Sequence, residues 1–307
     1  MRNLNSNPKT CSAKPIRKAV IPVAGLGTRM LPLTKAIPKE LLPVGNKPLI
    51  QHAVEEATCS GIQEVILVAA PGMSLIQEHF RRNLELERVL EGRGRQAEAE
   101  QLRVLCRCAN LHVAYQPHPL GLGHAIACSR DVVGGEPFAV ILPDALILSA
   151  KPCVRQLMDC YERVPGCYVA TREVEPGDLG RFGILQVSPV DDSPWAGLLY
   201  RVKGLVEKPE PECAPSRFGV FGRYLFEPDI FDYLEQASPD ENGEVQITDA
   251  LAAYCRKAPM YAFCFEGEHF DAGNKLEFLE ASVKVGLSDP EVGNRLRRFL
   301  KGVVDEC

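Results

Sequence analysis

The chain has 307 residues, of which 46% are hydrophobic, and a formal net charge of −5. Such a chain can bury one large core or two modest ones, and its mild acidity gives no reason to expect nucleic acid or an anionic membrane as a partner. It contains no apolar run of about 18 residues, so the sequence predicts no transmembrane helix.

The N-terminus and the cysteines bear on where the protein works. Residues 1–15 are polar and lack the apolar stretch of a secretory signal, so we expect a disordered tail there. The twelve cysteines include one C-x-C pair, Cys106 and Cys108, and no C-x-x-C pair, which favours neither a disulfide framework nor a zinc site. We therefore expect reduced thiols that pack as small hydrophobic side chains, and a cytoplasmic protein.

Apolar runs of strand length recur along the first part of the chain, with helical patterns between most of them. Strands are predicted at Ala19–Val23, Val65–Ala70, His112–Tyr115, Phe138–Leu142, Tyr168–Thr171 and Ile184–Val187. Helices are predicted at Leu49–Cys59, Ser74–Leu90, His124–Val132 and Val154–Val164. This alternation predicts an α/β fold with a Rossmann-like mixed, mainly parallel sheet and helices on both faces.

The later part of the chain has a different pattern. From about Asp178 onward it is richer in strands and prolines, with predicted strands at Leu198–Val206 and Gly219–Phe226. Helices are predicted at Gln246–Arg256, Lys275–Val285 and Val292–Leu300. Since neither an internal repeat nor a low-complexity linker is visible, one elaborated domain fits better than two independent ones.

A glycine-rich segment, Ala24-Gly25-Leu26-Gly27-Thr28-Arg29, directly follows the first predicted strand, and Pro38-Lys39-Glu40 comes nine residues later. Glycines let backbone N–H groups approach phosphate oxygens, and Arg29 and Lys39 add positive charge. A dinucleotide fingerprint would need a third glycine where Met30 stands, and the P-loop pattern occurs nowhere in the chain. The segment therefore predicts a polyphosphate loop and disfavours an NAD-type oxidoreductase or a P-loop ATPase.

These motifs resemble the signature of the sugar-nucleotide pyrophosphorylases, nucleotidyltransferases that join a sugar 1-phosphate to a nucleoside triphosphate. The resemblance covers residues 16–286 approximately and is closest to the bacterial uridylyltransferases, which also carry a charged helical insertion like that at 74–107. It implies the nucleotide-diphospho-sugar transferase fold in a single domain, 16–307. Within that domain we expect a nucleotide-binding part (about 16–177), a small strand-rich sugar-binding part (about 178–270) and C-terminal helices (271–307).

The resemblance implies a nucleotide site. A glutamine side chain can donate and accept at the edge of a pyrimidine, and the family uses the loop that begins at Gln116 to contact the base. Without the resemblance, this loop would be an ordinary turn before a helix. The residues implied to bind the nucleotide are Ala24, Gly25, Leu26, Gly27, Thr28, Glu40, Gln116 and Gly121.

Two aspartates are implied to bind Mg²⁺. Asp144 follows a predicted buried strand, where an aspartate is commonly a turn former, and Asp271 belongs to Phe270-Asp271-Ala272-Gly273-Asn274-Lys275. Both match metal-ligand motifs of the family, and Mg²⁺ prefers one or two carboxylates together with phosphate oxygens and waters. Because the two are far apart in the sequence, we expect the fold to bring them together.

The sugar side is implied by Val206-Glu207-Lys208-Pro209, although a bare E-K-P tripeptide also suits a surface turn. In the family the glutamate holds sugar hydroxyls and the lysine grips the sugar phosphate, roles that we carry to Glu207 and Lys208. Gly183 matches a glycine whose amide contacts the sugar, but Phe182 replaces the tyrosine before it. Changes at Gly219 and Phe221 also leave the identity of the sugar open.

The implied reaction transfers the uridylyl group of UTP to α-D-glucose 1-phosphate and gives UDP-glucose and pyrophosphate. Arg29, Lys39 and Lys208 are the expected catalytic residues, with Mg²⁺ as cofactor and a homodimer or homotetramer as the assembly. TTP or another hexose 1-phosphate remains an alternative, as does a catalytically silent regulatory paralogue. The intact Thr28-Arg29 pair favours an active enzyme.

Overall fold

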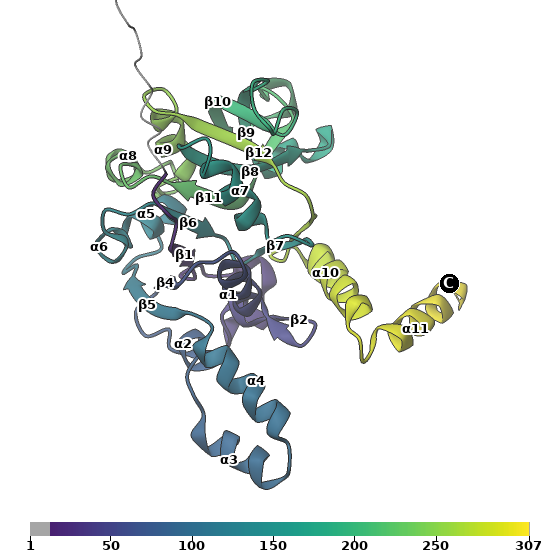
Figure 1. Ribbon diagram of the computed structural model, residues 1–307. Coiled ribbons are helices and arrows are strands. Elements are labelled where there is room, and N and C mark those ends of the chain that lie inside the picture. Colours follow the sequence, from purple (N-terminus) through teal and green to yellow (C-terminus); the bar gives the residue numbers. More distant parts are fainter. Residues whose placement is uncertain (1–12, 307) are drawn as a thin grey trace, which may run out of the picture.

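The computed structural model describes residues 13–306, so most of the tail expected at 1–15 lies outside the described residues (Figure 1). Its centre is a nine-stranded sheet in the order β5-β4-β1-β6-β11-β8-β12-β10-β9. In chain order these strands are β1 (Lys18–Pro22), β4 (Glu64–Ala69), β5 (Asn110–Tyr115), β6 (Phe138–Ile141), β8 (Cys167–Glu173), β9 (Gly183–Pro189), β10 (Leu199–Glu207), β11 (Phe218–Phe226) and β12 (Met260–Cys264). Each strand predicted from the sequence corresponds to one of these, and β12 was not predicted.

The sheet has a parallel half and a mostly antiparallel half. β5, β4, β1 and β6 run parallel in that spatial order, which is the arrangement of a Rossmann-like half. β11 then pairs antiparallel with β6 and β8, and β10 pairs antiparallel with β12 and β9, while β8 and β12 are parallel. The predicted α/β class and mixed sheet are confirmed.

Helices cover both faces of the sheet, as predicted, because successive strand residues point to opposite sides. Ile21 and Leu67 pack on one face with α1 (Leu49–Cys59) and α7 (Cys153–Tyr161). Val20, on the opposite face, packs with residues of four other helices. These are α5 (Gly121–Ala127), α6 (Arg130–Val133), α8 (Ile230–Gln236) and α9 (Ile247–Tyr254).

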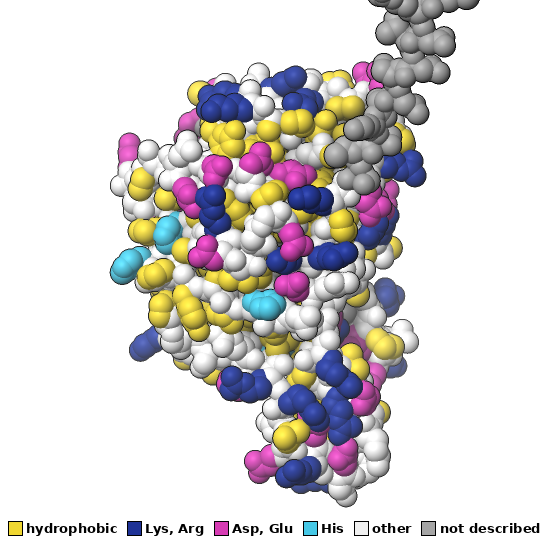
Figure 2. Space-filling model, turned by 60° about the vertical axis from the view of Figure 1, so that its left-hand side comes forward, with side chains coloured by type: hydrophobic (Ala, Val, Ile, Leu, Met, Phe, Trp, Pro, Cys, Tyr) yellow, Lys and Arg dark blue, Asp and Glu magenta, His cyan; other side chains and the backbone are white. Residues whose placement is uncertain are grey.

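The helix predicted at Ser74–Leu90 is wrong as a single element. The structure has α2 (Leu75–His79), α3 (Leu84–Gly92) and α4 (Gln96–Arg107), with the break before Asn83. The Asn83 side chain accepts a hydrogen bond from the Leu86 amide at 3.0 Å and thereby caps a new helix. α3 and α4 form a hairpin that projects from the body, with side chains of both charges on its surface (Figures 1 and 2).

The helix predicted at His124–Val132 is also divided. α5 ends at Ala127, and α6 (Arg130–Val133) follows. Between them the amide and hydroxyl of Ser129 both donate to the Ile126 carbonyl, at 2.9 and 2.6 Å, which tightens the chain and ends the first helix.

Short strands near the site were not predicted. β7 (Ala145–Leu148) pairs antiparallel with β13 (Glu268–Asp271), and β2 (Pro43–Val44) pairs with β3 (Lys47–Pro48). In the described part of the chain, short 3₁₀ helices occur at Thr28–Met30, Leu33–Lys35, Lys39–Leu41, Pro176–Arg181 and Pro211–Cys213.

The chain ends in α10 (Lys275–Ser288) and α11 (Gly293–Glu306), which extend away from the sheet (Figure 1). None of the helices formed by residues 13–306 has the length and apolar character needed to span a membrane. The expected division into nucleotide-binding, sugar-binding and C-terminal parts stays a prediction.

Candidate functional site

Two adjoining cavities open beyond the carboxyl ends of the parallel strands, where ligands of such sheets bind. The first has a volume of about 400 Å³, and its lining includes Lys39 and every residue predicted to bind the nucleotide. The second has a volume of about 270 Å³ and is lined by Arg29 and the residues predicted for the sugar side, Gly183, Glu207 and Lys208. Leu122, Leu142 and Asp144 line both cavities, so Asp144 lies at their border.

The glycine-rich loop is packed tightly against Lys39. Gly27 has φ +63°, and a Cβ there would lie 3.2 Å from both Lys39 Cβ and Thr34 Cγ2. The Thr34 hydroxyl donates to the Gly27 carbonyl at 2.8 Å. The loop therefore needs glycine at this position both for its conformation and for the close passage of the lysine.

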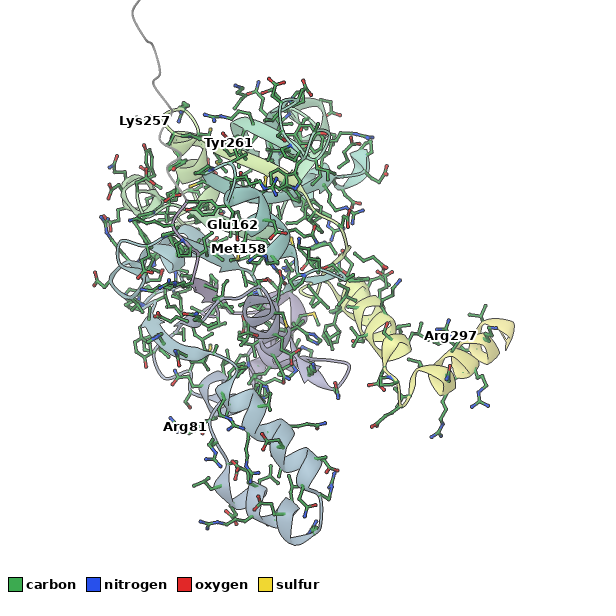
Figure 3. The ribbon with its side chains drawn as sticks, in the orientation of Figure 1. Arg81, Met158, Glu162, Lys257, Tyr261 and Arg297 are labelled. Atoms are coloured by element: carbon green, nitrogen blue, oxygen red, sulfur yellow. The ribbon has the colours of Figure 1, made fainter. Side chains whose placement is uncertain are left out.

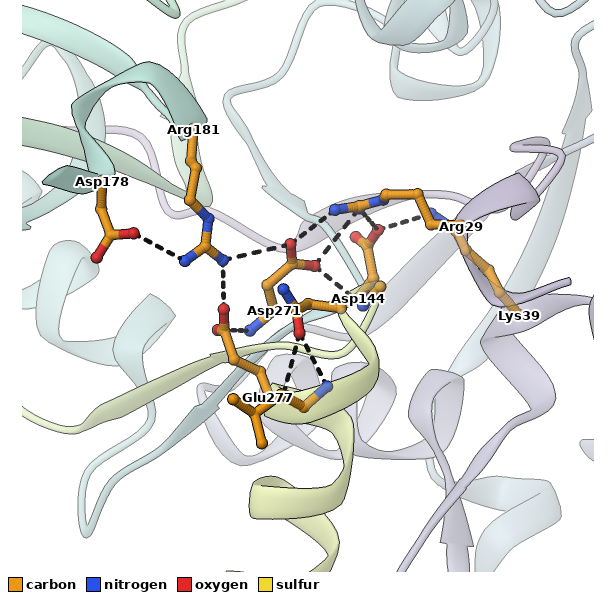
Figure 4. Close-up of polar contacts among 10 residues, drawn as sticks. Arg29, Lys39, Asp144, Asp178, Arg181, Asp271 and Glu277 are labelled. Atoms are coloured by element: carbon orange, nitrogen blue, oxygen red, sulfur yellow. Dashed lines mark hydrogen bonds and ion pairs between the residues drawn. The ribbon is translucent and has the colours of Figure 1, made fainter. Parts of the chain in front are cut away.

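Two cations and two carboxylates form a compact group at the border of the cavities (Figure 4). Lys39 Nζ lies 2.6 Å from Asp144 Oδ2, and Arg29 Nη1 lies 2.8 Å from Asp271 Oδ2. A further ion pair, 3.8 Å long, joins Arg29 Nη2 to Asp144 Oδ2. The four side chains thus form one charge-balanced group, which we call the quartet.

Two members of the quartet, Lys39 and Asp144, keep each other ionised. Burial lowers the pKa of Lys39, but the neighbouring Asp144 and Glu40 outweigh it and the pKa is raised overall. Burial likewise raises the pKa of Asp144, but Lys39 and Arg29 outweigh it and that pKa is lowered. Lys39 is therefore a cation and Asp144 an anion at neutral pH.

The unpredicted pair of short strands brings the two aspartates together. In the register of β7 and β13, Asp271 pairs with Ala145, the residue after Asp144. The Ala272 amide donates to the Asp144 carbonyl at 2.7 Å. The expected convergence of the two carboxylates is thus present, and its cause is this antiparallel pairing.

Two residues that the sequence did not indicate orient Asp271 (Figure 4). The Asp271 amide donates to Glu277 Oε2 at 2.7 Å, and Arg181 forms an ion pair with the same glutamate. Arg181 also lies 4.0 Å from Asp271 Oδ2 and 3.2 Å from Asp178 Oδ1. Arg181 and Glu277 are 96 positions apart, so no local pattern in the sequence connects them.

Glu40 is an unsatisfied acid in the wall of the first cavity. Its side chain is 1% exposed, and neither carboxylate oxygen has a hydrogen-bond partner among the described residues. Burial raises the pKa of Glu40 to about 7, against the attraction of Lys39. An unpartnered acid in a cavity wall is a candidate contact for a ligand.

The base loop is fixed by an internal bond and by a second segment. The side-chain Nε2 of Gln116 donates to the Gly121 carbonyl at 3.0 Å. Gly121 has φ +89°, and a Cβ there would lie 2.9 Å from the Val245 carbonyl oxygen. Val245 in turn accepts a bond from the Gly123 amide and donates one to the Leu120 carbonyl, at 2.9 and 2.8 Å.

The segment around Val245 was missed as part of the site. Glu244 lines the first cavity, and Gln246 and Thr248 line the second. Gln246 and Thr248 fall at the start of the helix predicted at Gln246–Arg256, and α9 begins at Ile247, so no motif in the sequence marked them as part of a cavity.

The sugar-side cavity has a polar rim and an aromatic wall. Lys208 has φ +40° and is 59% exposed, with its Nζ 3.2 Å from Glu207 Oε1. The rings of Phe182 and Phe221 lie 5.0 Å apart, and that of His269 lies 4.8 Å from Phe221. Burial lowers the pKa of His269 to about 4, so this ring is neutral at physiological pH.

The donor set suits a divalent cation that arrives with phosphate groups. Asp144 and Asp271 both contact Arg29, and hard carboxylate oxygens are the ligands that Mg²⁺ prefers. Within residues 13–306 there is no cluster of three or more His, Cys, Asp or Glu side chains suited to a metal. A cation held here would thus draw its remaining ligands from substrate and water.

Comparison with known proteins gives consistent matches. The profile of the nucleotidyl transferase family matches residues 18–287. The chain is 43% identical to the UTP–glucose-1-phosphate uridylyltransferase YngB of Bacillus subtilis (strain 168), over 95% of this chain and 96% of that protein. A UTP-bound UGPase from Acinetobacter baumannii is 35% identical with a TM-score of 0.84, covering 93% of this chain and 99% of that one. A UDP-glucose pyrophosphorylase complexed with UDP-glucose is also 35% identical, with a TM-score of 0.78 over 87% of this chain and 97% of that one.

Proposed function

Since the chain belongs to the nucleotidyl transferase family, we propose that it transfers the uridylyl group of UTP to α-D-glucose 1-phosphate, giving UDP-glucose and pyrophosphate. The observation that carries this proposal is the pair of adjoining cavities with Asp144 at their border. One cavity has a glycine loop and a glutamine suited to a nucleotide, and the other has polar groups suited to a sugar phosphate. The similar proteins named above bind UTP and UDP-glucose.

The proposed chemistry is a single in-line displacement. A phosphate oxygen of glucose 1-phosphate forms a bond to the α-phosphorus of UTP, and the bond from that phosphorus to the bridging oxygen of the β-phosphate breaks. Pyrophosphate leaves with the electron pair. Because the attacking phosphate is already an anion at neutral pH, the site needs no general base, and catalysis rests on positioning and charge stabilisation.

We assign the cationic residues by their place at the two cavities. The amides of Gly25–Thr28, with Arg29, would hold the leaving pyrophosphate. Arg29 is suited to this role because its side chain is 60% exposed and its Nη2 lies 3.8 Å from Asp144, the residue at the border of the cavities. Lys39, beside the same loop, and Lys208, at the second cavity, would neutralise the reacting phosphates.

The remaining residues would select the substrates. Gln116 and Gly121 would contact the uracil ring, and Ala24 and Glu40 would complete the nucleotide site. Glu207 would hold sugar hydroxyls, and the Gly183 amide would contact the sugar. A Cβ at Gly183 would lie 3.3 Å from Glu207 Oε2 and 3.1 Å from Thr248 Cγ2, so a larger residue would crowd the sugar cavity.

We propose that Mg²⁺ is the cofactor and that Asp144 and Asp271 hold it. When bound, it would neutralise phosphate charge and hold phosphate oxygens in place. Lys39 and Arg29 pair with these carboxylates in the structure, so each aspartate would exchange a cationic side chain for the metal.

We further propose a cytoplasmic homodimer or homotetramer. The C-terminal arm, α10 and α11, supports the proposal of self-association because it exposes large apolar side chains. Leu276 and Leu279 on α10 are 64% and 60% exposed, and Phe299 and Val304 on α11 are 65% and 73% exposed. Figure 3 shows Arg297 on α11, the part of the arm that lies farthest from the sheet.

The test of this function is pyrophosphate release by the purified chain across a panel of substrates. With Mg²⁺, we expect UTP and glucose 1-phosphate to be the preferred pair, with UDP-glucose formed in equal amount. If the protein prefers TTP or another hexose 1-phosphate, the assigned substrates change but the reaction class stays the same. Failure to release pyrophosphate with any pair would indicate a silent paralogue and contradict the proposal.

A further inference from the structure

Arg223 of β11 is a buried cation that lines neither of the two cavities. It is 1% exposed and is the largest of the fully buried side chains. Burying a charged group costs free energy unless it is paired and fully hydrogen-bonded. The partners of Arg223 therefore indicate what this buried charge stabilises.

One partner is Glu56 of α1. Arg223 Nη2 donates to Glu56 Oε2 at 2.8 Å, and Arg223 Nε lies 3.1 Å from both carboxylate oxygens. Glu56 Oε1 also accepts from the Val154 amide, at the start of α7, at 3.1 Å. The glutamate thus links two helices of one layer to a central strand and fixes the orientation of the guanidinium.

The other partners lie on the segment that carries Asp144. Arg223 Nη1 donates to the carbonyl of Leu142 at 2.9 Å and to that of Gly222 at 3.1 Å. The Leu142 amide donates to the same Gly222 carbonyl at 2.9 Å. Both backbone polar groups of Leu142, two residues before Asp144, are therefore held by β11.

A bulge in β11 makes these hydrogen bonds to Leu142 possible. The pairing of β11 with β8 shifts register between Val220 and Tyr224, and Gly222 within the bulge has φ +66°. A Cβ at Gly222 would lie 2.9 Å from Ala145 Cβ and 3.1 Å from Leu142 Cβ. Because Gly222 has no Cβ, β11 can approach the turn between β6 and β7 more closely than it could with any other residue at that position.

We propose that Arg223, oriented by Glu56, is a positioning residue that fixes the turn from Leu142 to Ala145 and so places the Asp144 carboxylate for Mg²⁺ and the reacting phosphates. The inference rests on the proposed function, since that function gives Asp144 its role. It predicts that loss of Arg223 weakens the use of Mg²⁺ more than the binding of the uridine and sugar groups. A buried ion pair that served stability alone would not have this effect.

The test compares Arg223→Met with the break of an ion pair elsewhere in which the carboxylate is buried. The control is Glu87→Gln in the α3–α4 hairpin, where a 3% exposed carboxylate is held by Arg82 and Arg103. Both variants break an ion pair that has a buried member. In the control pair the partners Arg82 and Arg103 are 51% and 26% exposed, and only Arg223→Met touches the Asp144 turn. For Arg223→Met we expect the Mg²⁺ concentration that gives half-maximal activity to rise about 10- to 100-fold. For Glu87→Gln we expect it to stay at the wild-type value despite lower thermal stability.

A binding readout separates this inference from the proposed reaction. UDP-glucose should raise Tm in EDTA, and Mg²⁺ should raise it further. In Arg223→Met we expect the first increment to persist and the second to be lost. If the wild-type protein binds UDP-glucose but releases no pyrophosphate, only the proposed function is contradicted. If Mg²⁺ raises the Tm of Arg223→Met as much as that of the wild type, only the inference about Arg223 is contradicted.

A second variant covers the case in which Arg223→Met does not fold. Replacing both partners, Glu56→Leu with Arg223→Met, removes the unpaired buried charge and commonly preserves folding. The Leu142 carbonyl is still released in this double variant, so the Mg²⁺ requirement should still rise. A wild-type Mg²⁺ requirement in the folded double variant would show that the pair is only structural.

Discussion

At the scale of single residues, Glu40 is the side chain whose burial is least compensated. It is 1% exposed without a partner for either oxygen among residues 13–306, and burial raises its pKa from 4.5 to about 7. An acid whose pKa is raised on folding weakens stability as pH rises, because the unfolded chain loses its proton first. The loss of unfolding free energy caused by burying ionised Glu40 begins near pH 4.5, grows until about pH 7 and is complete above that pH.

The corresponding prediction concerns Glu40→Gln. At pH 8 the ionised wild-type side chain costs about 3 kcal/mol of unfolding free energy, a cost that the neutral amide does not have. We expect the difference in unfolding free energy between variant and wild type to shift in favour of the variant by about that amount between pH 4.5 and pH 8. Denaturant unfolding at several pH values measures it. A difference that does not change with pH would contradict the account of Glu40.

A second prediction at this scale concerns Lys208. Loss of a preorganised donor to a transferring phosphate costs about 3 kcal/mol of barrier, so we expect Lys208→Ala to lose at least about a hundredfold in turnover. Lys203, an exposed lysine on β10, the strand that ends directly before Lys208, supplies the control, and Lys203→Ala should keep wild-type turnover. Near-normal turnover of Lys208→Ala would remove this residue from the reaction.

The residues that the motifs indicated lie together at the two cavities, whereas those that orient them were not foreseen. Asp144 and Asp271 were expected from their motifs, since each motif is continuous in the chain. Arg181 and Arg223 act through ion pairs to Glu277 and Glu56 that join distant parts of the sequence. Such pairs leave no local pattern, so only the folded chain reveals them.

At the scale of elements, length alone did not decide which strands could be predicted, since the four-residue β6 was expected and the five-residue β12 was not. Strands with long apolar runs, such as β4 and β11, were expected because a run of that length and composition is typical of a buried strand. The four-residue strands β7 and β13 were not, although their pairing brings the two aspartates together. The helix expected at Ser74–Leu90 was divided because a single capping residue, Asn83, outweighed the continuing helical pattern.

The element-scale prediction concerns the C-terminal arm. If α11 packs against a second copy of the chain, Phe299→Glu places a charge in that interface and should reduce the assembly to a smaller species. Arg297→Glu introduces the same acid on the opposite side of the helix, two positions away, and should leave the assembly unchanged. Light scattering coupled to size-exclusion chromatography measures both. A monomeric wild-type chain would contradict the proposed oligomer.

At the scale of the whole molecule, the alternation of strands and helices was enough to predict the α/β class and the layers on both faces. The order of the C-terminal strands was not predictable, since β11 inserts between β6 and β8 through pairings of high sequence separation. This insertion places the bulge of β11 against the turn that carries Asp144. The loops that follow β1 and β5 line the same cavity as Asp144. The fold thus builds two adjoining cavities around one carboxylate.

The central claim is that the uridylyl group passes directly between two substrates held in these cavities. The most direct measurement is the exchange of labelled pyrophosphate into UTP, with Mg²⁺ present. A single displacement predicts no exchange when the sugar phosphate is omitted, and exchange through reversal of the reaction when glucose 1-phosphate is added. Exchange without the sugar phosphate would reveal a covalent uridylyl-enzyme and contradict the account.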